Sequence, residues 1–328
     1  MKIRTPKHHY LYLPILFCTL LFSSLSVMAE QVNKSLDVSQ NSLIEIKHVN
    51  GKAKVIGWDK NQVKVEGELG DKTKKFRFER DGKSVIIEVK VENSNNGWGW
   101  DHDGGSGDDL TIYVPHQSQV DYHSPNAELS IKDVYGGSDI EMINGDLRAS
   151  NLKGRIRLKT VNGDIRGQKL AGELTLDAVN GDIKVDQTLG ENIRVNTVNG
   201  DIEVKSTAKE VSADTVNGDI EFTLGNVSEV KTSTVNGSIE MDMNLVDGGT
   251  LRASSVGGDL RFGFQKGVQA KFDIEAHAGG SIKNRLTEKS PEKAKYGPRK
   301  WLEFSTGEPT SRVDLSTVHG RIEVKTRN

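Results

Sequence analysis

The sequence predicts an all-β protein built as a β-solenoid, a parallel β-helix-like stack of coils with about 18–20 residues each. No segment has the 3.6-residue period of an amphipathic helix. Apolar and polar residues instead alternate in short runs from Ser42 onward, bounded by Gly, Asn and Asp. An Asn-Gly pair also returns at a nearly constant spacing, which indicates a repeat architecture rather than a single compact sheet.

Residues 1–29 have the order of a secretory signal peptide. Basic residues precede the apolar run LYLPILFCTLLFSSLSV (11–27), and the small residue Ala29 stands at the expected cleavage point. An uncleaved membrane anchor is the alternative, because a run of this length lies at the lower edge of a membrane span. Pro14 and the serine-rich end favour cleavage. We therefore expect an exported chain without a stable membrane span, in the periplasm or at the cell surface.

The composition narrows the class of partner. The only cysteine, Cys18, lies in the signal segment, so the exported chain would be held by packing and backbone hydrogen bonds without disulfides. Without residues 1–29 the chain would keep 41 Lys and Arg against 46 Asp and Glu, since the segment removes three basic and no acidic residues. A mixed, mildly acidic chain is not expected to bind nucleic acid, which favours clustered Lys and Arg.

Residues 30–125 are predicted to form an irregular all-β region that caps the solenoid. Alternating runs such as VIIEV (85–89) indicate short strands. The low-complexity segment NSNNGWGWDHDGGSGDD (93–109), which includes Asp108, is expected to be a surface loop before the strand LTIYVP (110–115).

Residues 126–328 are predicted to be the solenoid itself. The Asn of each Asn-Gly pair marks the repeat, and successive markers are 18 or 19 residues apart. Gly257 and Ala278 continue the series, an insertion near 285–304 follows, and TVHGRIEV (317–324) closes it. The markers are Asn144, Asn162, Asn180, Asn199, Asn217 and Asn236.

Two architectures fit the alternation within each repeat. In a hairpin meander, Asn-Gly would form a type I′ turn and pair the two strands of one repeat. In a solenoid, each strand would pair with the equivalent strand of the next coil. The solenoid is preferred because a meander would leave its apolar face uncovered, and because stacking explains why the same residue recurs at each position.

The repeated Asn-Gly-Asp is expected to be mainly structural. Asn and Gly tolerate positive φ at a corner, and stacked Asn side chains could hydrogen-bond along the coil axis. The Asp carboxylates are expected to accept hydrogen bonds from turn amides. Calcium bound between the carboxylates is the alternative, since calcium prefers oxygen ligands. The calcium candidates are Asp164, Asp182, Asp201 and Asp219.

The loop at 93–109 is the main candidate for a specific ligand contact. Paired indoles suit sugar faces and a His-Asp cluster suits cations, so the candidate contacts are Trp98, Trp100, Asp101 and His102. No HExxH, GxSxG or phosphate loop occurs in the chain, and neither catalytic residues nor a cofactor are predicted.

Several of these motifs resemble the bacterial "putative adhesin" family of unknown function. The matching segments are VNGKAKVIGWD (49–59), DLTIYVP (109–115), the NGDI series and STVHGRIEV (316–324). The resemblance implies a β-solenoid and a role in surface adhesion. It supplies no catalytic residues.

We therefore expect a non-enzymatic binding or scaffolding module of the cell envelope, whose partner is an envelope polysaccharide or protein. Two alternatives remain. The coils could stack end to end into a structural polymer, because open solenoid ends are strand edges. An enzyme that acts on polysaccharide is the other, although it would need a unique carboxylate pair where this chain repeats one at every coil.

Overall fold

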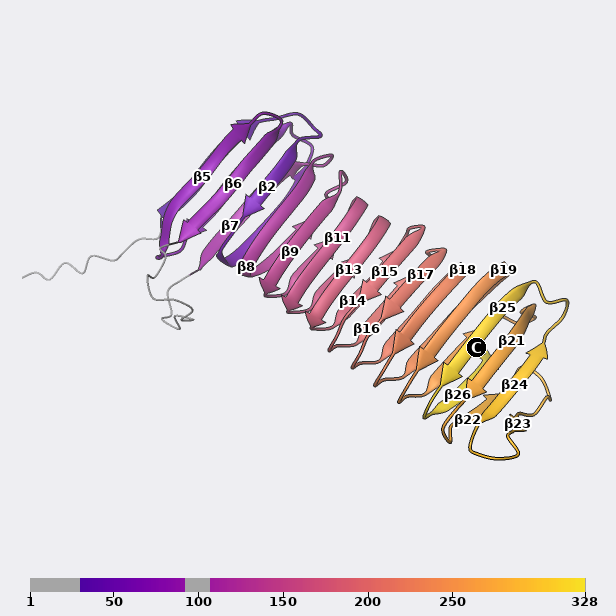
Figure 1. Ribbon diagram of the computed structural model, residues 1–328. Coiled ribbons are helices and arrows are strands. Elements are labelled where there is room, and N and C mark those ends of the chain that lie inside the picture. The colour runs from indigo at the N-terminus through magenta and orange to yellow at the C-terminus, as the bar shows by residue number, and fades with distance from the viewer. Residues whose placement is uncertain (1–29, 92–106, 328) are drawn as a thin grey trace, which may run out of the picture.

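The computed structural model describes residues 30–91 and 107–327, and every regular element within them is a β-strand. Figure 1 shows these strands stacked as the rungs of an elongated two-layered rod. The signal peptide and the ligand-contact residues predicted between 92 and 106 lie outside the described residues.

Each coil contributes one strand to each layer. In a typical coil, β9 (Ser138–Asn144) leads through the Asn-Gly-Asp corner into β10 (Leu147–Ser150), and a second corner leads to β11 (Lys153–Asn162). β9 pairs in parallel with β11, and β10 pairs in parallel with β12 (Ile165–Gln168). Strands therefore pair between coils and not within them, which confirms the solenoid and rules out the hairpin meander.

The layer that precedes the Asn-Gly-Asp corner is called sheet I. Its neighbouring strands are mostly parallel, with antiparallel pairs at both ends. In spatial order sheet I contains β5 (Thr73–Asp81), β6 (Ser84–Val91), β2 (Leu43–Lys47), the first half of β8 (Gln119–Lys132), β9, β11, β13 (Ala171–Asn180), β15 (Asn192–Asn196), β17 (Glu210–Asp214), the second halves of β18 (Ile220–Thr234) and β19 (Ile239–Ser255), β25 (Ser311–Thr317), β21 (Ala270–Ala276), β24 (Lys300–Ser305) and β23 (Glu292–Lys293).

The layer that follows the corner is called sheet II. In spatial order it contains β1 (Glu30–Asp37), β4 (Gln62–Leu69), β7 (Asp108–Pro115), β3 (Asn50–Trp58), the second half of β8, β10, β12, β14 (Ile183–Thr188), β16 (Ile202–Ser206), the first halves of β18 and β19, β20 (Leu260–Phe264), β26 (Arg321–Thr326) and β22 (Ser281–Asn284).

The parallel stacking extends further toward the N-terminus than residue 126. β2 pairs in parallel with the start of β8, and β3 pairs in parallel with its end. The expected boundary between residues 125 and 126 falls inside β8, so the first regular coil already begins at β2.

One thin core lies between the two sheets. Inward residues alternate along the strands of the coils, as at Leu174, Leu176 and Ala178 before a corner and Ile183 and Val185 after it. Each is 6 % exposed or less. Since a coil buries only a few such side chains, each coil depends on its neighbours for most of its hydrophobic stabilisation.

The stack order departs from the chain order at the C-terminal end. β25 lies between β19 and β21, and β26 lies between β20 and β22. The closing repeat, with His319 at its corner, is therefore inserted between the coils of Gly257 and Ala278. The insertion near 285–304 supplies β24, which pairs antiparallel with β21 at the end of sheet I.

Candidate functional site

The most regular surface of the rod is the edge formed by the Asn-Gly-Asp corners. Successive Asn side chains form a ladder in which each Nδ2 donates to the Oδ1 of the previous rung, at 2.6–2.9 Å. The ladder consists of Asn126, Asn144, Asn162, Asn180, Asn199, Asn217 and Asn236. Each Asn side chain thereby links its coil to the neighbouring coils.

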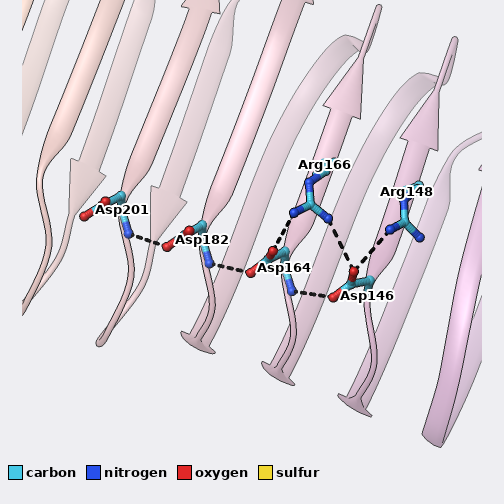
Figure 2. A network of polar contacts seen from close by, with 6 residues as sticks. All are labelled: Asp146, Arg148, Asp164, Arg166, Asp182 and Asp201. Carbon is cyan, nitrogen blue, oxygen red and sulfur yellow. Dashed lines mark hydrogen bonds and ion pairs between the residues drawn. The ribbon is translucent and has the colours of Figure 1, made fainter.

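The Asp of each corner caps the next rung. Its Oδ1 accepts a hydrogen bond from the backbone N–H of the equivalent residue one coil further, at 2.7–3.2 Å. Figure 2 shows this chain from Asp146 to Asp201 and the two arginines beside it, Arg148 and Arg166, which pair with Asp146 and Asp164. The expected bond between carboxylate and turn amide is confirmed, and the donated N–H partly compensates the negative charge of each carboxylate.

Calcium at Asp164, Asp182, Asp201 and Asp219 stays a prediction that the arrangement does not favour. One oxygen of each carboxylate is already bonded to an amide. Over the residues that the structure describes, no three His, Cys, Asp or Glu side chains come together in a way that could hold a metal ion.

The Thr and Gly of the motif close the corner. Thr197, Thr215 and Thr234 are buried, and each Oγ1 donates to a Gly carbonyl of the previous coil at 3.2–3.4 Å. The Gly residues stack so closely that no side chain fits between them. In the coils of Thr197 and Thr215, four of the five residues in TVNGD are therefore committed to building the corner.

The remaining residue of the motif is an exposed aliphatic side chain. It is 38–48 % exposed in seven successive coils, and we call this row the valine edge. The valine edge consists of Ile143, Val161, Val179, Val198, Val216, Val235 and Val256. Residues on an outward-facing position are usually polar, so a row of aliphatic side chains is an unusual exposed apolar surface.

A shallow groove runs beside the N-terminal part of the valine edge. It has a volume of about 630 Å³, and its lining includes Ile143, Val161 and Val179 together with Glu141 and Lys159. The groove runs across several rungs, so it follows the rod axis. An elongated, partly apolar partner fits it better than a compact polar ligand.

A second group of polar residues lies buried near the N-terminal end. His48 Nδ1 lies 2.8 Å from the Tyr122 hydroxyl, and His48 Nε2 lies 3.2 Å from Asp108 Oδ2. Asp108 Oδ1 accepts hydrogen bonds from the Gly70 N–H at 2.7 Å and the Thr73 hydroxyl at 2.8 Å. The group fastens β7 to the neighbouring coils.

The electrostatics of this group also suit a structural role. Burial raises the pKa of Asp108, but the contact with His48 and the hydrogen bonds from Gly70 and Thr73 outweigh it, so the pKa lies below its usual value. Burial also raises the pKa of Tyr122. His48, Asp108 and Tyr122 are each at most 1 % exposed, so a substrate could not reach them.

Sequence reasoning misplaced one feature described above, Asp108, and missed another, the valine edge. Asp108 was expected in a surface loop, which is wrong, because it begins β7, is 1 % exposed and accepts hydrogen bonds from Gly70 and Thr73 inside the protein. The valine edge was missed, although its signal is present. The residue before each Asn has outward parity and is nevertheless always Val or Ile in these coils.

The ligand contacts predicted at Trp98, Trp100, Asp101 and His102 lie outside the described residues. In residues 30–91 and 107–327, no helix has the length and apolar composition needed to cross a membrane.

A family model described as Toastrack DUF4097 matches residues 35–325. A search of curated proteins found no match. Several solved structures are similar to this chain. A "putative adhesin" from Parabacteroides merdae is 13 % identical, with 90 % of this chain and 96 % of that chain covered and a TM-score of 0.42.

Two further structures have comparable values. A "putative lipid binding protein" from Parabacteroides distasonis is 12 % identical, with 90 % and 97 % of the two chains covered and a TM-score of 0.38. A "putative adhesin" from Bacteroides fragilis is 13 % identical, with 90 % and 97 % covered and a TM-score of 0.35.

Proposed function

We propose that this chain, which belongs to the Toastrack DUF4097 family, is an exported, non-enzymatic binding or scaffolding module of the bacterial cell envelope. Its docking surface is the valine edge. The partner is an envelope polysaccharide or protein that lies along the rod.

One observation carries this proposal. The Thr, Asn, Gly and Asp of the repeated motif are all used to build the corner, whereas the aliphatic residue between Thr and Asn faces solvent in seven successive coils. Exposed rows of apolar side chains mark interaction sites on soluble proteins. The valine edge therefore has a use outside the architecture of the coil.

We propose a non-enzymatic role because of the polar groups that the described residues contain. The carboxylates of the edge recur at each coil and are bonded to amides, whereas a glycosidase needs one distinct pair. The buried contact of His48 with Asp108 is closed to solvent. Neither arrangement offers a reactive group to a substrate.

Growth end to end is the structural alternative, and the ends of the rod argue against it. Sheet I ends in β5, an edge strand of sequence TKKFRFERD whose side chains are largely charged. At the other end of sheet I, β24 runs antiparallel to β21, and the short β23 runs antiparallel to β24. Charged and antiparallel edge strands discourage the addition of another coil.

The proposal is tested by co-sedimentation of the purified protein with peptidoglycan sacculi and with outer-membrane vesicles. The four-fold variant Val161→Thr, Val179→Thr, Val198→Thr and Val216→Thr keeps the β-branched shape and makes the centre of the apolar row polar. We expect the wild type to sediment with one of the two preparations and the variant to remain largely in solution.

The matched control is Leu189→Thr, which alters an aliphatic side chain that is 60 % exposed at the other corner of the coil. It should bind as the wild type does. Equal sedimentation of the wild type and the four-fold variant would show that the valine edge is not the docking surface.

A further inference from the structure

We propose that the valine edge docks on the valine edge of a second copy of this chain, in an antiparallel two-fold arrangement. The inference rests on the proposed function, because it names the partner of the same surface. The two-fold axis passes between the rung of Val179 and the rung of Val198.

The first argument is the extent and the centre of the row. The position before the corner Asn continues beyond the seven exposed residues of the valine edge, through Pro125 and the half-buried Val49 at one end and the half-buried Val318 at the other. The full row has ten rungs, and its midpoint lies between Val179 and Val198. The row is Val49, Pro125, Ile143, Val161, Val179, Val198, Val216, Val235, Val256 and Val318.

The second argument is the spacing. Stacked coils repeat at the strand separation of about 4.8 Å, so ten rungs span about 43 Å. A partner with a different repeat would lose register along such a row. A second copy has the same repeat at every rung, so its apolar side chains could interdigitate along the full length, as they do in paired sheets.

The third argument is area. The strip from the aliphatic row to the outward position four residues earlier is about 13 Å wide, which gives about 550 Å² on each copy. Two copies would bury about 1,100 Å² in total, which lies just below the range of stable specific interfaces and suits a weak, reversible one.

The fourth argument is charge on sheet I. The outward residues four positions before each residue of the row form a column on sheet I, and their charge changes sign along the rod. In the antiparallel arrangement this column faces the partner's column in reverse order. Asp139 then lies opposite Lys231, and Asp121 lies opposite Arg252. In the column two residues before the row, Lys159 meets Asp214. The first column is Glu45, Asp121, Asp139, Arg157, Thr175, Arg194, Ser212, Lys231, Arg252 and Asp314.

Like charges meet at few places in this arrangement. In these two columns the only like-charged pair is Glu45 with Asp314, at the outer ends. The corner aspartates would also face the corner aspartates of the partner in reverse order. They lie beyond the asparagine ladder, however, and are bonded to amides. In a parallel two-fold arrangement each rung would face the same rung of the partner, so the opposite-charge pairs of Asp139 with Lys231 and Asp121 with Arg252 would not form, and charge favours the antiparallel arrangement.

The first experiment measures mass. The protein is purified from the envelope of cells that express the full chain, and sedimentation equilibrium is followed over a range of concentrations. We expect a reversible dimer whose dissociation constant rises at least tenfold with Thr at Val161, Val179, Val198 and Val216. Leu189→Thr should dimerise as the wild type does, and circular dichroism should show both variants folded.

The second experiment measures orientation in a Cys18→Ser background. Val161→Cys and Val216→Cys should form a disulfide with each other when the two variants are mixed, because these rungs meet across the axis. Each variant alone would place its own cysteines about three rungs apart, about 14 Å, which is beyond disulfide reach.

A protein that stays monomeric at all concentrations, or that cross-links each single variant with itself, would overturn the inference. Monomeric protein that still sediments with envelope preparations through the valine edge would leave the proposed function standing. Dimer formation without envelope binding would support the dimer and would contradict binding of the valine edge to an envelope component.

Discussion

Gly200 lies directly against the carbonyl oxygen of Gly181 in the preceding coil. A Cβ atom added to Gly200 would come within 2.1 Å of that oxygen, which is far inside contact distance. The same approach recurs along the edge, as at Gly218 over Gly200 and Gly237 over Gly218. The rise of the solenoid at this corner is therefore set by backbone packed on backbone.

Gly200→Ala should lower the free energy of unfolding by about 3 kcal/mol, because the two coils must move apart at the corner. The melting temperature should fall accordingly. Thermal melting followed by circular dichroism measures the change. Gly257→Ala is the matched control, since its Cβ would meet nothing closer than 3.6 Å. Equal melting temperatures for the two variants would contradict the close approach.

Removal of one amide from the asparagine ladder should have a cost that depends on its position. Asn199 donates to Asn180 and accepts from Asn217, so Asn199→Ala loses two hydrogen bonds, or about 2 kcal/mol. Asn236 donates to Asn217, and the next rung has Gly257 in place of Asn. Asn236→Ala should therefore lose about half as much in denaturant unfolding.

A buried charge distinguishes the two faces of a strand. Val195 is fully buried in β15, whereas Val198, three residues later, belongs to the exposed valine edge. Val195→Asp should unfold several coils, because a buried unpaired carboxylate costs several kcal/mol. Val198→Asp should melt within a few degrees of the wild type. A stable Val195→Asp protein would disprove the inward assignment.

Acid should weaken the N-terminal coils through Asp108. The folded protein holds the pKa of Asp108 below its usual value, so the folded state favours the ionised carboxylate. Its contribution is present above the ordinary carboxylate pKa of about 3.9 and is lost as the pH falls through the lower folded value. Asp108→Asn should lower stability by about 2 kcal/mol at pH 7.

The same variant should also flatten the acid limb of the stability curve. Melting of the wild type and of Asp108→Asn between neutral pH and strong acid should therefore converge at low pH. Parallel curves would show that Asp108 does not couple folding to protons in this range.

Local patterns were enough to predict the coil. The alternation around Thr197 fixes which residues face inward, and the recurrence of Asn-Gly at 18 or 19 residues indicates stacking of like on like. The bond from Asp182 to the next coil also follows from sequence, because a column of carboxylates needs donors. These features depend only on neighbours one period away.

Features that depend on distant segments could not be predicted in the same way. The insertion of β25 and β26 inside the stack joins residues about sixty positions apart, as with Ser255 and Thr317, and no period reports it. Asp108 looked like loop composition because its partner His48 lies in another coil. The exposure of Val198 required knowledge of where the strand leaves the sheet and enters the corner.

Because the corners repeat the same contacts, the length of the rod can change only by whole coils. Each corner needs only a Gly beneath its own Gly, an Asn beneath its Asn and an amide above its Asp, and each neighbouring coil supplies the same set. Excision of residues 181–199 would bring Asn180 directly before Gly200 and restore the motif over the coil of Gly163. The molecule would shorten by one step of about 4.8 Å. Gain or loss of whole coils would therefore change the length of the rod in fixed increments while its surface chemistry stays the same.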